Sequence, residues 1–296
     1  MRITSAETSS EPPLSPVRRG LAIPAREEAI PVAGCTISYR VWGRSTENPP
    51  VLLVHGVLAH GRWWDPVAGW LSEDRQVVAV DLSGMGDSGR RDVYDRLLHA
   101  QEIERVARHA GIEGAILVAH SYGGDPAIRC CQRARGLFSR LVLLDSRLML
   151  PDVYRYPHDN PVRKAIYASA AEAETRFKLV PESRHADAEL IAHIARHSVT
   201  QEDGGWSWKF DGRVVQAEMP PLDPRDLTLP IAFIRGGDSD VTPPDQMEVT
   251  RAYLPGASFL ELPAAGHHLM IDQPLALVAM LRGLFARNEP ERERTR

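Results

Sequence analysis

Residues 115–124 read Ala-Ile-Leu-Val-Ala-His-Ser-Tyr-Gly-Gly, and this segment is the strongest structural signal in the chain. Its apolar start is typical of a strand buried on both faces, and a helical pattern follows the two glycines. A sharp turn between a strand and a helix needs small residues two positions before and after its central residue, because the two backbones approach closely there. Ala119 and Gly123 meet this requirement around Ser121. The segment therefore predicts a strained strand-turn-helix unit that exposes Ser121; an ordinary link with a capping serine is the alternative.

Similar short apolar stretches occur along the chain, and most of them are followed by a helical pattern. This alternation is typical of an α/β fold in which a mostly parallel sheet is covered by helices on both faces. The first stretch alternates with a period of two and predicts an antiparallel strand. The predicted strands cover residues 36–42, 51–54, 76–80, 115–119, 141–144, 231–234 and 258–262, and a closing helix covers residues 275–285.

The alternation stops between the strand at 141–144 and the strand at 231–234. Prolines, helical patterns and three aromatic residues at every second position occupy this interval, and we interpret it as an inserted helical lid. The three aromatic residues are Trp206, Trp208 and Phe210. The predicted organisation is a flexible N-terminal tail at 1–29, a core formed by 30–146 and 231–288, a lid at 147–230 and a C-terminal tail at 289–296.

Composition excludes several classes of partner. The 296-residue chain has a formal net charge of -4 and no run of Lys and Arg, so we expect no nucleic acid to bind. Its apolar runs are far shorter than the roughly 20 residues of a membrane helix, and its first residues lack the apolar region of a secretory signal. Three cysteines do not suit a disulfide framework. We therefore expect a cytoplasmic protein that acts on a small molecule; the sequence does not indicate its oligomeric state.

Four motifs occur in the order typical of one protein family. They are Val54-His55-Gly56-Val57, the glycine-rich residues 81–88, the segment around Ser121, and Gly266-His267-His268. Together they resemble the α/β-hydrolase superfamily, in particular its esterase-like members with a serine nucleophile, over residues 36–287.

The resemblance implies a catalytic role for residues in three of these motifs. Ser121 would be the nucleophile and His267 the base, with His268 as the alternative base. The backbone N–H groups of Val57 and Tyr122 would form the oxyanion hole. These roles together imply a serine hydrolase.

The acid that orients the base has two candidates. Family members most often carry it in a Gly-x-x-Asp turn after the seventh strand, but counting from Gly236 reaches Ser239 instead of an acid. Counting from Gly237 selects Asp240. A second family arrangement places the acid one strand earlier, which here is Asp145. We prefer Asp145 and keep Asp240 as the alternative.

The implied function is cleavage of an ester, a lactone or a similar carbonyl compound through an acyl-enzyme on Ser121. No cofactor and no metal are expected; His193 and His197 stand four apart on a predicted helix, but no third ligand accompanies them. Three alternatives stay open. They are carbon–carbon bond hydrolysis, a cofactor-free peroxidase or oxygenase, and a non-catalytic small-molecule receptor.

Overall fold

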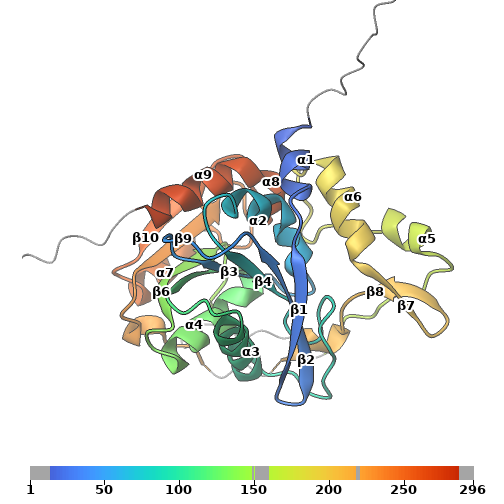
Figure 1. The fold of residues 1–296 in the computed structure, drawn as a ribbon, viewed down its shortest axis with the longest axis horizontal. Coiled ribbons are helices and arrows are strands. Elements are labelled where there is room, and N and C mark those ends of the chain that lie inside the picture. The colour runs from blue at the N-terminus through green and yellow to red at the C-terminus, as the bar shows by residue number, and fades with distance from the viewer. Residues whose placement is uncertain (1–13, 149, 151–159, 218–220, 287–296) are drawn as a thin grey trace, which may run out of the picture.

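The computed structural model describes residues 14–148, 150, 160–217 and 221–286. Helices and strands alternate along most of this range (Figure 1). The strands are β1 (Arg26–Val32), β2 (Cys35–Trp42), β3 (Val51–Val54), β4 (Val77–Val80), β5 (Ala115–His120), β6 (Phe138–Leu144), β7 (Val199–Glu202), β8 (Gly205–Trp208), β9 (Ile231–Gly236) and β10 (Ser258–Leu262). The α-helices are α1 (Pro16–Leu21), α2 (Asp65–Leu71), α3 (Arg96–His109), α4 (Gly124–Arg133), α5 (Ala170–Thr175), α6 (Ala188–His197), α7 (Pro244–Tyr253), α8 (Leu269–Asp272) and α9 (Pro274–Phe285). Four short 3-10 helices are η1 (Gly61–Trp64), η2 (Ser121–Gly123), η3 (Gly212–Gln216) and η4 (Pro224–Asp226).

Within the described residues, an eight-stranded sheet has the order β1-β2-β4-β3-β5-β6-β9-β10. Six neighbouring strands are parallel, namely β4, β3, β5, β6, β9 and β10, and β1 and β2 extend the sheet antiparallel at one edge. Carboxyl ends of parallel strands meet at one edge of a sheet, so the loops after β3, β5, β6 and β9 lie together. The α/β fold predicted from the sequence is confirmed.

Both faces of the central strands are buried, as their apolar runs predict. In β3, Leu52 and Val54 belong to one apolar cluster, while Val51 and Leu53 belong to the other. Helices α3, α4 and α7 cover the first face, and α2, α8 and α9 cover the second (Figure 1). Within the described part of the chain, no helix is long and apolar enough to cross a bilayer.

The described residues between β6 and β9 add no strand to the eight-stranded sheet, and part of this interval lies to one side of the sheet (Figure 1). Its described residues form helices α5 and α6 and an antiparallel hairpin of β7 and β8. Helix α5 packs on α6 and on the hairpin, and α6 also contacts η1 of the core. The expected lid range therefore contains a hairpin in addition to helices.

The structure differs from the sequence prediction near the N-terminus. Residues 14–29, which the sequence predicts to be part of a flexible tail, contain α1 and the start of β1. Helix α1 packs on α2 and α9, and β1 pairs with β2 at the sheet edge. Periodicity did not reveal β1 because an edge strand with a solvated side carries Arg26, Glu27 and Glu28 in place of an apolar run. Residues 1–13 and the predicted C-terminal tail at 289–296 lie outside the described range.

Candidate active site

Ser121 follows β5 directly and has a φ of 51°, a left-handed backbone conformation that is rare for a residue other than glycine. The two glycines after Tyr122 permit this turn. A Cβ at Gly123 would stand 2.6 Å from the carbonyl oxygen of His55, and one at Gly124 would stand 2.5 Å from Ser146 Oγ. At Gly123, the small residue that the sequence argument requires is therefore required by close backbone approach.

Ser121, His267 and Asp145 form a continuous chain of hydrogen bonds. Ser121 Oγ lies 2.9 Å from His267 Nε2, and His267 Nδ1 lies 2.7 Å from Asp145 Oδ2. A carboxylate only accepts hydrogen bonds, so Nδ1 carries the proton and donates it to Asp145. The free lone pair on Nε2 then accepts from the Ser121 hydroxyl, which is the arrangement that general-base catalysis requires.

Asp145 lies just after β6 and is completely buried. Besides His267, three groups donate hydrogen bonds to its carboxylate: the Gly236 N–H at 3.0 Å, Ser239 Oγ at 2.5 Å and Thr242 Oγ1 at 2.6 Å. A buried charge needs such partners to offset the loss of water. The loop after β9 therefore solvates and orients Asp145.

Asp240 lies in the same loop but is exposed, and no hydrogen bond joins it to His267 in the described structure. Ser239, the residue that occupies the family's more common acid position, donates a hydrogen bond to Asp145. Of the two acids considered from the sequence, the structure brings only Asp145 to His267.

Val57 and Tyr122, the expected oxyanion-hole residues, stand on the loops after β3 and β5. Tyr122 is the second residue of η2, and N–H groups in the first turn of a helix have no carbonyl partner within that helix. His55 supports the loop that contains Val57, because its ring contacts the Gly56 carbonyl at 2.7 Å and accepts from the Leu82 N–H at 3.1 Å. Burial lowers the pKa of His55 to about 4, so this histidine is a neutral structural group.

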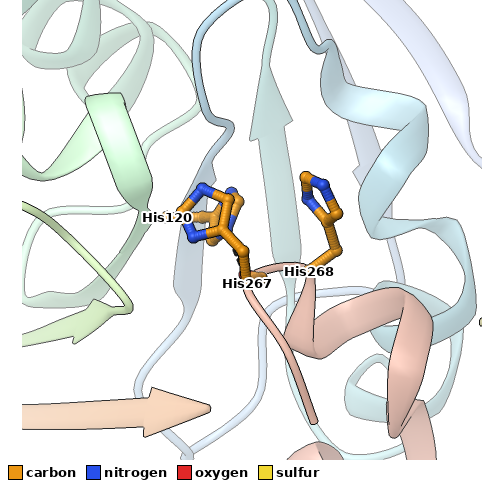
Figure 2. A group of neighbouring side chains, drawn as sticks. All are labelled: His120, His267 and His268. Atoms are coloured by element: carbon orange, nitrogen blue, oxygen red, sulfur yellow. Dashed lines mark hydrogen bonds between the residues drawn. The ribbon is translucent and has the colours of Figure 1, made fainter. Parts of the chain in front are cut away.

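Two further histidines lie next to His267: His268, which the sequence offered as the alternative base, and His120, which sequence reasoning missed as a site residue. His120 Nε2 donates a hydrogen bond to the His267 carbonyl at 2.8 Å, and His268 Nε2 donates to the Pro181 carbonyl at 3.1 Å. Figure 2 shows the three imidazoles close together, with His267 and His268 on the same loop. Burial lowers the pKa of His268 to about 3 and that of His120 well below its usual value. Both are therefore neutral, and the hydrogen bond from His120 holds the backbone of the loop that carries His267. In the sequence, the position of His120 directly before Ser121 could have indicated that it belongs to the site.

The same three histidines are the group of potential metal ligands within the described residues, with ligand atoms within 4.8 Å of one another (Figure 2). However, both ring nitrogens of His267 already contact Ser121 and Asp145. An ion bound to His267 would have to break one of these contacts. His193, considered from the sequence as a ligand with His197, instead contacts Asp65 Oδ2 at 2.9 Å.

A pocket of about 380 Å³ lies between the core and the interval that contains α5 and the β7–β8 hairpin. This volume is within the range of small-molecule sites. Val57 and Trp63 line it from the core, and Trp208 and Phe210, two of the three aromatic residues noted in the sequence, line it from the other side. Trp206 is not among the lining residues; its backbone pairs with Tyr167 instead.

Comparison with known proteins agrees with this fold. The profile of the alpha/beta hydrolase family matches residues 51–280. Esterase Rv0045c of Mycobacterium tuberculosis is 28% identical over 265 residues, which cover 84% of this chain and 86% of that protein. Esterase YbfF of Escherichia coli is 25% identical over 241 residues, which cover 79% of this chain and 92% of that protein.

Among solved structures, the thioesterase domain from the curacin biosynthetic pathway has a TM-score of 0.75 at 24% identity, covering 88% of this chain and 99% of that domain. This likeness concerns the fold. The chain belongs to the alpha/beta hydrolase family. It is accordingly a hydrolase, in line with the esterases among its relatives.

Proposed function

We propose that the protein is a serine hydrolase that cleaves an ester or a similar carbonyl compound through an acyl-enzyme on Ser121. The observation that carries this proposal is the hydrogen-bond chain from Ser121 through His267 to Asp145, which begins at a strained turn. The two relatives named as esterases support the ester class. No metal and no cofactor enter the proposed reaction.

In the proposed reaction, His267 Nε2 takes the proton of Ser121 as its oxygen attacks the substrate carbonyl. Asp145 stabilises the imidazolium that forms. His267 returns the proton to the leaving alcohol, and the carbon–oxygen bond of the ester breaks. Water then attacks the acyl-enzyme with His267 again as the base, which releases the carboxylic acid and restores Ser121.

The N–H groups of Val57 and Tyr122 are the proposed oxyanion hole. The negative charge develops on the former carbonyl oxygen, and fixed N–H donors stabilise that charge without reorganising. The support for this assignment is positional, because both residues are on loops at the edge of the sheet where Ser121 lies. Residues 147–230 are proposed to act as the lid over this edge.

Labelling with a fluorophosphonate probe tests the proposal. We expect covalent labelling of the protein and loss of labelling in Ser121→Ala, because only an activated serine attacks the phosphorus. Ser139→Ala, which removes an exposed hydroxyl at the start of β6, is the matched control and should label fully. Hydrolysis of a 4-nitrophenyl ester should follow the same pattern.

Two outcomes would contradict the proposal. Full labelling and turnover in Ser121→Ala would place the nucleophile elsewhere. Absence of labelling and turnover in the parent protein, together with tight ligand binding, would indicate the receptor function considered from the sequence.

A further inference from the structure

The charged side chains that line the pocket beside Val57 have one sign. Four cationic residues line it, and no acidic side chain does so among the described residues. This is unlike the whole chain, in which 39 Asp and Glu outnumber 35 Lys and Arg. The four cations are Arg163, Arg176, Lys178 and Lys209. They come from three separate segments, so the tertiary structure and not one basic stretch assembles them.

Three of these cations have no counterion among the residues that the structure describes. Lys209 pairs with Asp87 at 2.5 Å. Arg163, Arg176 and Lys178 make no ion pair with any described residue, although ion pairs are frequent elsewhere in this chain. The histidine in the wall, His60, is neutral because burial lowers its pKa well below the usual value. Like charges gathered around a pocket repel one another, and an anion in the pocket would remove that repulsion.

The pocket adjoins the proposed reaction centre. Val57, one proposed oxyanion donor, is part of its wall. The ring of Trp63, another wall residue, packs edge-on against His268 with their centroids 5.4 Å apart. Val180 also lines the pocket and precedes Pro181, whose carbonyl accepts the hydrogen bond from His268. The pocket wall thus contains one proposed oxyanion residue and a tryptophan that packs on the histidine loop, while Ser121 and His267 themselves are not among the lining residues.

We propose that the substrate is an anionic ester, in which a carboxylate or an equivalent anion on the acyl chain or the alcohol binds the cationic pocket. This inference rests on the proposed function and names the substrate class for the same site. The apolar wall, which includes Phe177, Trp208 and Phe210, would contact the chain between the ester and the anion. Arg176 and Lys178 would contact the anion itself.

Matched esters that differ only in charge test this inference. On the acyl side, 4-nitrophenyl hydrogen adipate is compared with its methyl ester; on the alcohol side, 4-carboxyphenyl hexanoate is compared with its methyl ester. We expect kcat/KM for at least one anionic ester to exceed that of its neutral partner by about tenfold at low salt. The ratio should fall when salt is raised from about 0.01 M to about 1 M, because the Debye length shortens from roughly 30 Å to roughly 3 Å.

Variants assign the preference to the pocket. Arg176→Gln combined with Lys178→Gln should lower the ratio of anionic to neutral kcat/KM by about tenfold, and Arg176→Glu, which changes the pocket charge by the same two units, should lower it to a similar extent. Arg105→Gln removes an exposed cation from α3, outside the pocket, and is the matched control that should keep the parental ratio. Melting temperatures of all variants verify that they are folded.

The outcomes separate this inference from the proposed function. If the parent hydrolyses the neutral esters at least as well as the anionic ones, the inference is overturned and the serine-hydrolase proposal stands. A preference that survives in Arg176→Glu would also overturn the inference, because the anion would then bind elsewhere. If the parent neither hydrolyses any of the four esters nor reacts with the fluorophosphonate, both proposals fail together.

Discussion

At the scale of single residues, the positive φ angles are the most informative feature of the site. Ser121 has a φ of 51° and Asp145 a φ of 44°, although neither is glycine. Both stand at the carboxyl end of a buried strand, where the turn redirects the chain and aims the side chain toward His267. Strain of this kind persists only where the surrounding structure holds it. Around Asp145 that structure is a set of four hydrogen-bond donors, which leads to a specific mutational prediction.

We expect Asp145→Asn to lower turnover of a neutral ester by about a thousandfold or more, because an amide does not hold His267 with its proton on Nδ1. The amide NH₂ would also face hydroxyl and N–H donors where the carboxylate had accepted hydrogen bonds. Asp240→Asn is the matched control and should retain activity close to the parent, because Asp240 is exposed. Steady-state kinetics of the two variants decide between the acids. Equal activity of Asp145→Asn and the parent would remove Asp145 from the proposed mechanism.

At the scale of secondary-structure elements, the site depends on how closely the loop after β10 approaches β9. The Gly237 N–H bonds to the Leu262 carbonyl at 2.9 Å, and the Asp238 N–H bonds to the Ala265 carbonyl at 2.9 Å. On the other side of this loop, the Gly266 N–H bonds to Asp272 Oδ2 at 2.8 Å. These contacts place the residue that follows Gly266, the proposed base, within reach of Ser121 from a distant part of the chain.

Gly236, the last residue of β9, makes this close approach possible. A Cβ there would collide with the Gly266 carbonyl and stand 2.7 Å from that of Ala265, both backbone atoms that cannot rotate away. We expect Gly236→Ala to destabilise the protein by about 1–3 kcal/mol and to reduce turnover by displacing the histidine loop. Gly256→Ala is the matched control, since a Cβ at Gly256 would meet nothing within 4 Å. Denaturant unfolding and ester kinetics on both variants check this, and a fully active Gly236→Ala would contradict the role given to this glycine.

At the scale of the whole molecule, a set of buried histidines makes stability depend on pH. Burial lowers the pKa of His55 to about 4 and that of His268 to about 3, and it holds the pKa values of His60 and His120 well below the usual value. Below about pH 6.5 the unfolded chain protonates these groups while the folded protein does not. The unfolded state then binds more protons, so stability falls as the pH falls. Asp81 acts in the opposite direction, because burial raises its pKa to about 6.

We expect the free energy of unfolding to decrease between pH 7 and pH 5. Burial also lowers the pKa values of His99 and His197, so six histidines oppose two aspartates, Asp81 and Asp272, whose pKa values are raised by burial. Each histidine contributes at most about 1.4 kcal/mol per pH unit. Denaturant unfolding at the two pH values measures the change. His268→Gln should reduce the difference, because its amide can still donate to the Pro181 carbonyl but does not titrate. Stability that is flat across this range would contradict the neutral state assigned to the buried histidines.

Local patterns in the sequence were sufficient to predict strands β2, β3, β4, β5, β6, β9 and β10 of the sheet and the turn around Ser121. The apolar run at 51–54 predicts β3 residue for residue, and the other core strands begin or end within a few residues of their predicted limits. Burial on both faces requires continuous apolar runs, and the close packing of a strand on a helix requires small residues, so both leave local signals. Helix α1 and strand β1 left no such signal, because they pack at the periphery and carry charged side chains.

The contacts between distant segments could be read only from the tertiary structure. The sequence left two acids for the site, and the folded chain shows which carboxylate is buried within reach of His267. It also brings His120 against the His267 backbone and gathers four cations from three segments around one pocket. Hydrophobic periodicity and turn residues indicate the local structure in which a segment can be buried. The distance between two side chains far apart in the chain depends instead on how the helices and strands pack against one another.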